Sequence, residues 1–175
     1  MNLINTIYRN IRYAWPLHFI LLLTNWMPNN VLAMRFRGLL IAPFFKKCGK
    51  DLRIARNNYF YNSQNIELGN HVFIADGNWF SGSTTISIED EVMFGPKSII
   101  ISGNHSKKEG SFRYGSPILK PIKIGRGSWI GGNCAILAGT KIGKCTVIAA
   151  NSVTRKEIPN NVLFAGNPGK IIKKI

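Results

Sequence analysis

The sequence predicts an all-β fold in which the chain coils into a three-sided parallel β-helix, preceded by a helical apolar segment and followed by a short basic tail. Two observations carry this prediction. Isoleucines stand six residues apart at Ile124, Ile130, Ile136, Ile142 and Ile148. Small or branched residues stand two positions before the last four, at Ser128, Cys134, Thr140 and Thr146. A period of six fits neither a helix nor a simple strand, but three units of strand and corner make a coil of about 18 residues.

The same period continues upstream and is then interrupted. Leu68, Ile74 and Phe80 are six apart, and Ile88, Phe94 and Ile100 repeat the spacing after a two-residue shift. Residues 103–120 are polar, charged and rich in glycine, so we expect them to project from one face, where functional loops occur. Counting hexads from about Leu52 to Thr154 without this excursion predicts between four and five coils. The predicted organisation is an N-terminal segment (1–50), a β-helix (51–155) with a protruding loop (103–120), and a basic C-terminal tail (156–175).

The N-terminal segment follows a different pattern. Ile4, Ile7 and Ile11 have helical spacing, Pro16 is expected to interrupt the helix, and an apolar run from Leu17 to Met27 ends at Pro28. No run reaches the roughly 20 apolar residues that a membrane-spanning helix needs, and no signal-peptide cleavage site follows. Two interpretations remain: residues 1–47 lie on a membrane surface as interfacial helices, or they form an apolar cap on the β-helix or between subunits.

Charge and cysteine content limit the partners. The net charge is +15 and is concentrated at the two ends, with eight basic residues and one acidic residue in 1–53, and five and one in 155–175. This favours phosphate-bearing partners, which are nucleic acid, an anionic lipid or a phosphorylated cofactor, with solubility alone as the alternative for each end. Nucleic acid fits poorly because no zinc spacing, helix-turn-helix or aromatic RNA-binding signature occurs. Three cysteines without metal spacing favour a reducing compartment, and no metal is expected.

His105 is the candidate catalytic residue that the repeat itself indicates. The sequence has three histidines, and His18 lies outside the repeat, which disfavours a histidine-ligated zinc site. His105 comes directly after the last regular hexad, at the root of the excursion, where its imidazole would lie beside the coil surface. Histidine suits general-base chemistry at neutral pH, although an exposed loop histidine without a role is the alternative.

The stretch from Trp129 to Ile175 resembles the hexapeptide-repeat acyltransferases, in the maltose, galactoside and xenobiotic O-acetyltransferase branch. The similar segments are Trp129-Ile130-Gly131, Ile142-Gly143, the run 147–153 (VIAANSV), Ile158-Pro159 and the run 165–168 (AGNP). With the earlier hexads, the resemblance covers about residues 52–175. It implies a left-handed parallel β-helix, a homotrimer with active sites between neighbouring coils, and acetyl-CoA as acyl donor.

The resemblance also implies roles for individual residues. His105 matches the catalytic histidine, which would deprotonate a sugar hydroxyl for direct attack on the thioester. Asn78 matches an acceptor-binding asparagine, Asp76 is its nearby substitute, and a backbone-satisfying corner residue is the alternative for both. The matching cofactor-binding positions are Trp129, Gly131, Gly132, Ala150, Arg155, Lys170 and Lys173. Asn151 replaces the usual glycine, and Lys170 stands where arginine is common, giving a point charge in place of a fork.

These observations predict an acetyl-CoA-dependent O-acetyltransferase that acts on a hydroxyl of a sugar or lipid-linked polysaccharide precursor. It is expected to be cytoplasmic and peripheral at the inner face of a bacterial membrane. An amino-sugar N-acetyltransferase and a non-catalytic β-helix that binds membrane or a partner are the two alternatives.

Overall fold

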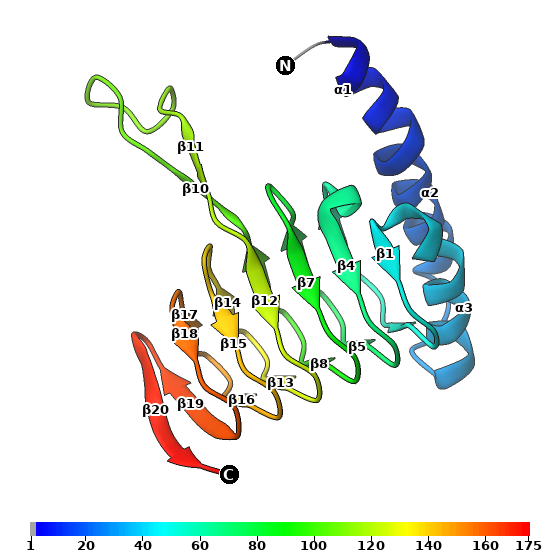
Figure 1. Ribbon diagram of the computed structural model, residues 1–175. Helices are drawn as coiled ribbons and strands as arrows, with labels where there is room; N and C mark the ends of the chain where they lie inside the picture. Colours follow the sequence, from blue (N-terminus) through cyan, green and yellow to red (C-terminus); the bar gives the residue numbers. More distant parts are fainter. Residues whose placement is uncertain (1–2) are drawn as a thin grey trace.

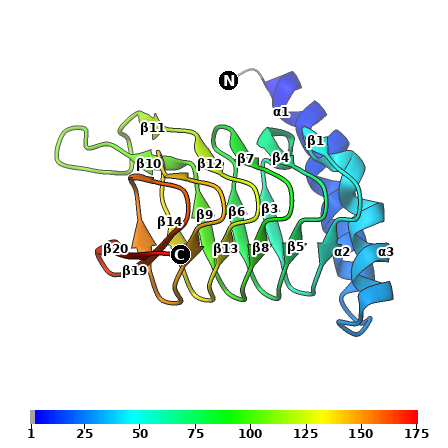
Figure 2. The same ribbon diagram turned by 60° about the horizontal axis from the view of Figure 1, so that its bottom comes forward.

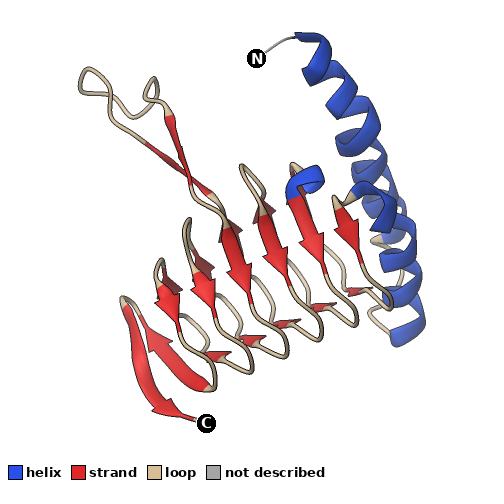
Figure 3. Ribbon diagram, in the orientation of Figure 1, coloured by secondary structure: helices blue, strands red, loops and turns tan. Residues whose placement is uncertain are grey.

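The protein is a parallel β-solenoid with three faces, seen in a computed structural model that describes residues 3–175 (Figures 1 and 3). Met1 and Asn2, the first residues of the predicted N-terminal segment, lie outside the described residues. Face A has six parallel strands: β1 (Lys47–Cys48), β4 (Ile66–Leu68), β7 (Ile86–Ile88), β12 (Ile122–Ile124), β15 (Lys141–Ile142) and β18 (Glu157–Ile158).

The other two faces repeat this order. Face B contains β2 (Arg53–Ile54), β5 (Phe73–Ile74), β8 (Met93–Phe94), β13 (Trp129–Ile130), β16 (Val147–Ile148) and β19 (Val162–Gly166). Face C contains β3 (Tyr59–Tyr61), β6 (Trp79–Ser81), β9 (Ile99–Ile101), β14 (Ala135–Ile136) and β17 (Val153–Thr154). In Figure 2 these strands are seen in stacked rows. The predicted parallel β-helix is therefore confirmed, with about six turns.

The isoleucine repeat fills the centre of the prism. Ile124, Ile130, Ile136 and Ile148 are fully buried and Ile142 nearly so, because each hexad directs one large side chain inward. The predicted count of four to five coils is too low. Strands β1 and β18 add turns at the two ends, where the regular hexads are absent.

The two-residue shift after Phe80 has a local cause. The early coils turn from face C to face A through four-residue corners, as at 62–65, where Asn62 has φ 54° and a short 3-10 helix η3 (Ser63–Asn65) follows. The register shows the result, because Glu67 pairs with Ser87, twenty residues later, whereas Lys123 pairs with Lys141, eighteen residues later.

The small polar residues of the repeat hydrogen-bond the corners together. The Ser128 hydroxyl donates to the carbonyl of Gly143 (2.7 Å) and accepts from the backbone N–H of Thr146 (3.1 Å). The Thr140 hydroxyl donates to the carbonyl of Thr154 (2.9 Å). A buried backbone group without a partner is costly, so these side chains satisfy the bends between strands.

A helical arm closes the N-terminal end of the solenoid (Figure 1). It consists of α1 (Leu3–Arg9), a π-helical turn η1 (Asn10–Ala14), α2 (Trp15–Thr24), α3 (Val31–Ile41) and a 3-10 turn η2 (Ala42–Phe44). The expected break at Pro16 is wrong: the helix continues, because the wide turn η1 precedes the proline, which sits in the first turn of α2.

The arm is joined to the solenoid by packing and by one buried cation. Leu17, Leu21, Ile41 and Phe45 belong to the same apolar core as the rungs. The fully buried Arg37 donates from Nη1 to the carbonyl of Ile54 (2.6 Å) and from Nη2 to that of Thr24 (3.0 Å). The inner side of the arm is thus a cap, as one of the two interpretations expected.

Two hairpins leave the regular coil. In the excursion, β10 (Gly103–His105) pairs antiparallel with β11 (Pro117–Leu119), and this hairpin projects on the same side as α1 (Figure 1). At the C-terminus, β19 continues into β20 (Gly169–Lys174), which covers the end of face B. No helix among residues 3–175 is long and apolar enough to cross a membrane.

Candidate active site

Two edges of the prism carry the candidate site residues. The B–C edge, where face B turns into face C, is formed by residues 75–78, 95–98, 131–134 and 149–152. The C–A edge is formed by 62–65, 82–85, 102–121, 137–140 and 155–156. Neighbouring coils stack directly at the edges, as shown by the bond from the Asn151 N–H to the Gly132 carbonyl (3.0 Å).

His105 lies on the C–A edge as the last residue of β10. Its Cα partner in the hairpin is Pro117, and its backbone N–H donates to the Asn104 side-chain oxygen (2.8 Å). The residue is exposed, and within residues 3–175 its imidazole has no hydrogen-bond partner. Both ring nitrogens are therefore available to a ligand or to a neighbouring molecule.

Four of the predicted cofactor residues gather on the B–C edge. Trp129 is 51% exposed on face B, two residues before Gly131, and Gly132 follows at the corner. Ala150 is exposed on the next coil. A Cβ on Gly131 would lie 2.6 Å from the backbone nitrogen of Ala150, which explains why glycine is required where the coils approach. The two coils therefore stack closely at this corner, beside Trp129.

The predicted basic residues of the tail extend this edge. β19 stacks on β16, and Lys170 on β20 pairs with Ala165 of β19, while Lys173 pairs with Leu163. Both lysines are exposed. They lie next to the coil that carries Ala150, so the cation positions and the small-residue edge are adjacent.

Arg155 is separate from the other cofactor candidates. It is exposed on the C–A edge, the same edge as His105.

Asn151, which replaces glycine, has φ 61°, a left-handed conformation that asparagine adopts more readily than most residues. Its side-chain oxygen accepts from Asn133 (2.6 Å), so the substitution maintains the corner.

The side chain of Asp76 connects the arm to the solenoid through hydrogen bonds. Its carboxylate accepts from the side-chain amides of Asn29 (2.9 Å) and Asn57 (3.1 Å), and the Nε of Arg56 lies 3.9 Å away. Asn29 belongs to the turn between α2 and α3, so this carboxylate holds the turn against the B–C edge.

Asn78 is a corner residue, the alternative stated for it above. It is 1% exposed, its amide donates to the Ala75 carbonyl (2.8 Å), and its oxygen accepts from the Ser98 N–H (2.9 Å). The same contact recurs one coil earlier, where Asn58 accepts from the Asn78 N–H (2.9 Å). Because the side chain is buried and hydrogen-bonds the backbone inside the corner, we leave Asn78 out of the proposed acceptor site.

A single chain does not bring His105 and the cofactor edge together. Between Gly132 and Leu137 the chain crosses face C, about 16 Å at ~3.3 Å per residue. His105 lies beyond the far edge, on a hairpin that leaves the prism (Figure 1). A site that contains both requires either a long ligand or a second copy of the chain.

One feature was not predicted from the sequence: a cavity of about 530 Å³ that lies between the arm and the first coil, beside the face C strand β3. Its walls include Trp15 and Leu22 from the arm, and Tyr59, Tyr61 and Gln64 from the solenoid. The 20-residue spacing of Tyr59 and Trp79, whose rings stack with centroids 4.2 Å apart, is the sequence signal that could have indicated an aromatic surface here.

Comparison with known proteins shows the same fold and sequence pattern elsewhere. The family model for the bacterial transferase hexapeptide (six repeats) matches residues 121–156. Galactoside O-acetyltransferase of Escherichia coli is 30% identical over 139 residues, 79% of this chain and 68% of that protein. The structure of a galactoside acetyltransferase in complex with coenzyme A superposes with a TM-score of 0.83 and 27% identity, covering 96% of this chain and 82% of the other.

Two further relatives are similar over a smaller share of their length. A candidate acetyltransferase of Saccharomyces cerevisiae is 36% identical over 133 residues, 76% of this chain and 61% of the relative. A candidate lipopolysaccharide biosynthesis O-acetyl transferase of Escherichia coli is 34% identical over 125 residues, 64% of this chain. The present chain spans 59% of that second relative.

Proposed function

Because the chain belongs to the hexapeptide-repeat acetyltransferases of the galactoside and maltose O-acetyltransferase type, we propose that it transfers an acetyl group from acetyl-CoA to a hydroxyl of a carbohydrate. The observation that carries this proposal is the likeness, over 96% of the chain, to a galactoside acetyltransferase in complex with coenzyme A. An exposed histidine at the root of the excursion supplies the base that the reaction needs.

In the proposed reaction, a ring nitrogen of His105 accepts the proton of the acceptor hydroxyl. The oxygen then forms a bond to the acetyl carbonyl carbon, the carbon–sulfur bond breaks, and the imidazolium returns the proton to the departing thiolate. General-base assistance is worth about 10²–10⁴-fold, so most of the turnover should depend on this side chain. Hydrogen-bond donors toward the oxyanion would come from backbone N–H groups of the coil.

Acetyl-CoA is proposed to lie along the B–C edge. The small residues Gly131, Gly132 and Ala150 leave room for an extended pantetheine arm beside Trp129. Lys170 and Lys173, exposed on β20, would bind the phosphates as point charges. Arg155, on the C–A edge, would contribute to the same cofactor from a neighbouring copy or if the cofactor extended across face C.

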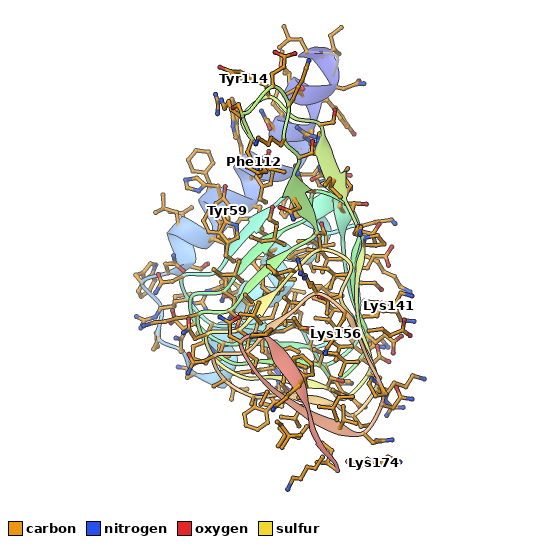
Figure 4. The ribbon with its side chains drawn as sticks, turned by 90° about the vertical axis from the view of Figure 1, so that its left-hand side faces the viewer. Tyr59, Phe112, Tyr114, Lys141, Lys156 and Lys174 are labelled. Carbon is orange, nitrogen blue, oxygen red and sulfur yellow. The ribbon has the colours of Figure 1, made fainter. Side chains whose placement is uncertain are left out.

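We infer that the working unit is a homotrimer, for two reasons. The catalytic and cofactor residues lie on different edges and would meet where the C–A edge of one copy faces the B–C edge of another. The outward side chains also differ: face A carries Lys47, Glu67, Lys123, Lys141 and Glu157, whereas face C carries Tyr59, Trp79, Ile99, Ala135 and Val153. Figure 4 shows Tyr59 and Lys141 on opposite sides of the prism. An apolar face suits contact between copies.

We also propose that the arm contacts the inner face of a bacterial cytoplasmic membrane, where a lipid-linked glycan would be available. Support comes from the outer side of α2 and α3, which exposes Phe19, Leu23, Trp26, Leu32 and Leu39. Basic side chains of the arm lie in the same segment and would favour binding to anionic lipid. Liposomes containing anionic lipid should bind the protein, and replacing Leu23 and Leu32 with aspartate should weaken that binding strongly. Equal binding by both proteins would contradict the membrane proposal.

Thiol release from acetyl-CoA tests the enzymatic proposal. Sugars that carry only hydroxyl groups should be acetylated, and His105→Ala should lower kcat by about 10²–10⁴-fold without unfolding the protein. His71→Asn is the matched control, because His71 is an exposed histidine with φ 56°, a conformation that asparagine tolerates. Acetylation of amino sugars alone would favour the N-acetyltransferase. Equal activity of His105→Ala and wild type would contradict the role of His105, and no transfer to any acceptor would favour a non-catalytic protein.

A further inference from the structure

The cavity between the arm and the first coil is placed to take part of a carbohydrate chain. Its volume, about 530 Å³, lies within the range of ~300–1,000 Å³ typical of small-molecule sites. Aromatic side chains line it from both elements, with Trp15 on α2 and Tyr59 and Tyr61 on β3. Trp15 and Tyr61 are exposed in the described structure and would contact the sugar, whereas one face of the Tyr59 ring is covered by Trp79 (centroids 4.2 Å apart).

Amide groups line the same cavity. Asn62 and Gln64 stand at the C–A edge of the first coil, and the Gln64 amide donates to the Asn62 oxygen (3.4 Å), a long and weak contact. Both residues keep donor or acceptor capacity beyond this bond. Aromatic faces pack against the C–H faces of sugar rings, while amides hydrogen-bond hydroxyls. The combination therefore suits a sugar better than a purely apolar ligand.

The cavity lies on the same face as the strand that leads into His105, and at the same edge of the prism. Tyr61 pairs with Ser81, and Ser81 pairs with Ile101, so the cavity is two coils from the strand that leads into His105. At a strand spacing of ~4.8 Å, the two strands are about 10 Å apart along the solenoid, and His105 lies four residues beyond Ile101 on the projecting hairpin. A glycan of several sugar units whose reacting hydroxyl lay at His105 could extend along the C–A edge and place its more distant units in the cavity.

Resting on the proposed function, we propose that the acceptor is an oligosaccharide or longer glycan and that this cavity binds sugar units further along the glycan than the acetylated one. The cavity is then a specificity site: it selects extended acceptors and does not participate in the chemistry. Residues that line it should change kcat/KM for extended acceptors and leave transfer to a monosaccharide unchanged.

The test compares a monosaccharide, the di- and trisaccharides that contain it, and its octyl glycoside as acceptors. The wild-type protein should prefer the trisaccharide over the monosaccharide by about tenfold or more, the size expected for one or two stacking contacts. Leu22→Trp, which adds bulk to a 58% exposed cavity wall, should remove this preference and leave monosaccharide turnover unchanged. Leu23→Trp is the matched control, because Leu23 is 69% exposed on the same helix and does not line the cavity.

Each other outcome has a defined meaning. If Leu22→Trp and Leu23→Trp give the same acceptor profile, or if the octyl glycoside gains the preference in place of the trisaccharide, the cavity does not bind sugar and the proposal is overturned. His105→Ala serves as the reference for the enzymatic function itself. Absence of His105-dependent transfer to every acceptor would overturn the proposed function, whereas His105-dependent transfer without a trisaccharide preference would overturn only the present inference.

Discussion

Replacing Arg37 with methionine is expected to loosen the helical arm while the solenoid stays folded. The guanidinium is fully buried and joins three carbonyls, those of Ile54 (2.6 Å), Thr24 (3.0 Å) and Met27 (3.4 Å). Each hydrogen bond from a charged donor contributes about 1.5–3 kcal/mol, and its loss leaves a buried carbonyl without a partner. Removing a buried cation offsets part of this loss, because burial disfavours the charged form and lowers the pKa of Arg37.

The net cost to the arm should be about 2–3 kcal/mol, which corresponds to amide exchange in the arm faster by on the order of 100-fold. Solenoid coils contact mainly their neighbours, so the central coils should keep their protection. Hydrogen-exchange mass spectrometry of the 15–45 and 86–150 regions measures both effects. Arg35→Met is the control: Arg35 is on the same helix, but its pair with Asp51 (2.6 Å) is partly exposed and should contribute at most about 1 kcal/mol. Unchanged protection of the arm in Arg37→Met would refute this reasoning.

Three further predictions concern the corners and the cysteines. Gly131→Ala should lower the melting temperature by several degrees, because the added Cβ would lie 2.6 Å from the Ala150 nitrogen; an unchanged melting temperature would show that the corner can relax. Hydrogen bonds from Arg53 and Arg35 hold the pKa of Asp51 below its ordinary value. The ionised Asp51 therefore stabilises the folded protein fully above about pH 4, and this contribution is lost as the pH falls from there toward the lowered pKa. Acid titration of arm fluorescence should therefore show a midpoint that moves in Asp51→Asn, and identical curves would contradict the role of Asp51. Burial raises the pKa of the Cys48 thiol to about 11 and also raises the pKa of Cys134. The exposed Cys145 should therefore react first with a thiol reagent at pH 8. Equal reaction rates of the three cysteines would contradict this order.

The repeat made most of the fold predictable because each hexad directs one side chain to the core. Ile74, Ile100 and Ile136 are all fully buried, as their spacing requires. The ends were harder to predict: Lys47–Cys48 and Glu157–Ile158 pair in register with their neighbours, although polar residues and shifted spacing conceal the hexad. Strand pairing uses backbone groups that every residue has, so it cannot be predicted from residue type as side-chain burial can.

The candidate site was predictable residue by residue, but its arrangement was not. Glycine and alanine at the B–C edge follow from the repeat, and His105 follows from the point where the repeat stops. Asn78 shows the limit, because an asparagine at a corner serves the backbone as well as it could serve a ligand. The cavity at Tyr61 depends on contact between the arm and a coil about 40 residues later in the chain, which no local pattern predicts.

The central claim is that acetyl transfer uses His105 of one copy and the B–C edge of another, and mixed trimers test it most directly. His105→Ala removes the base, and Ala150→Trp places bulk on the exposed cofactor edge without touching the core. Each variant alone should be nearly inactive. Trimers formed by random mixing of equal amounts should regain about a quarter of wild-type activity, because one pairing of neighbours in four contains an intact base and an intact edge. Activity no greater than that of the separate variants would contradict a site shared between copies.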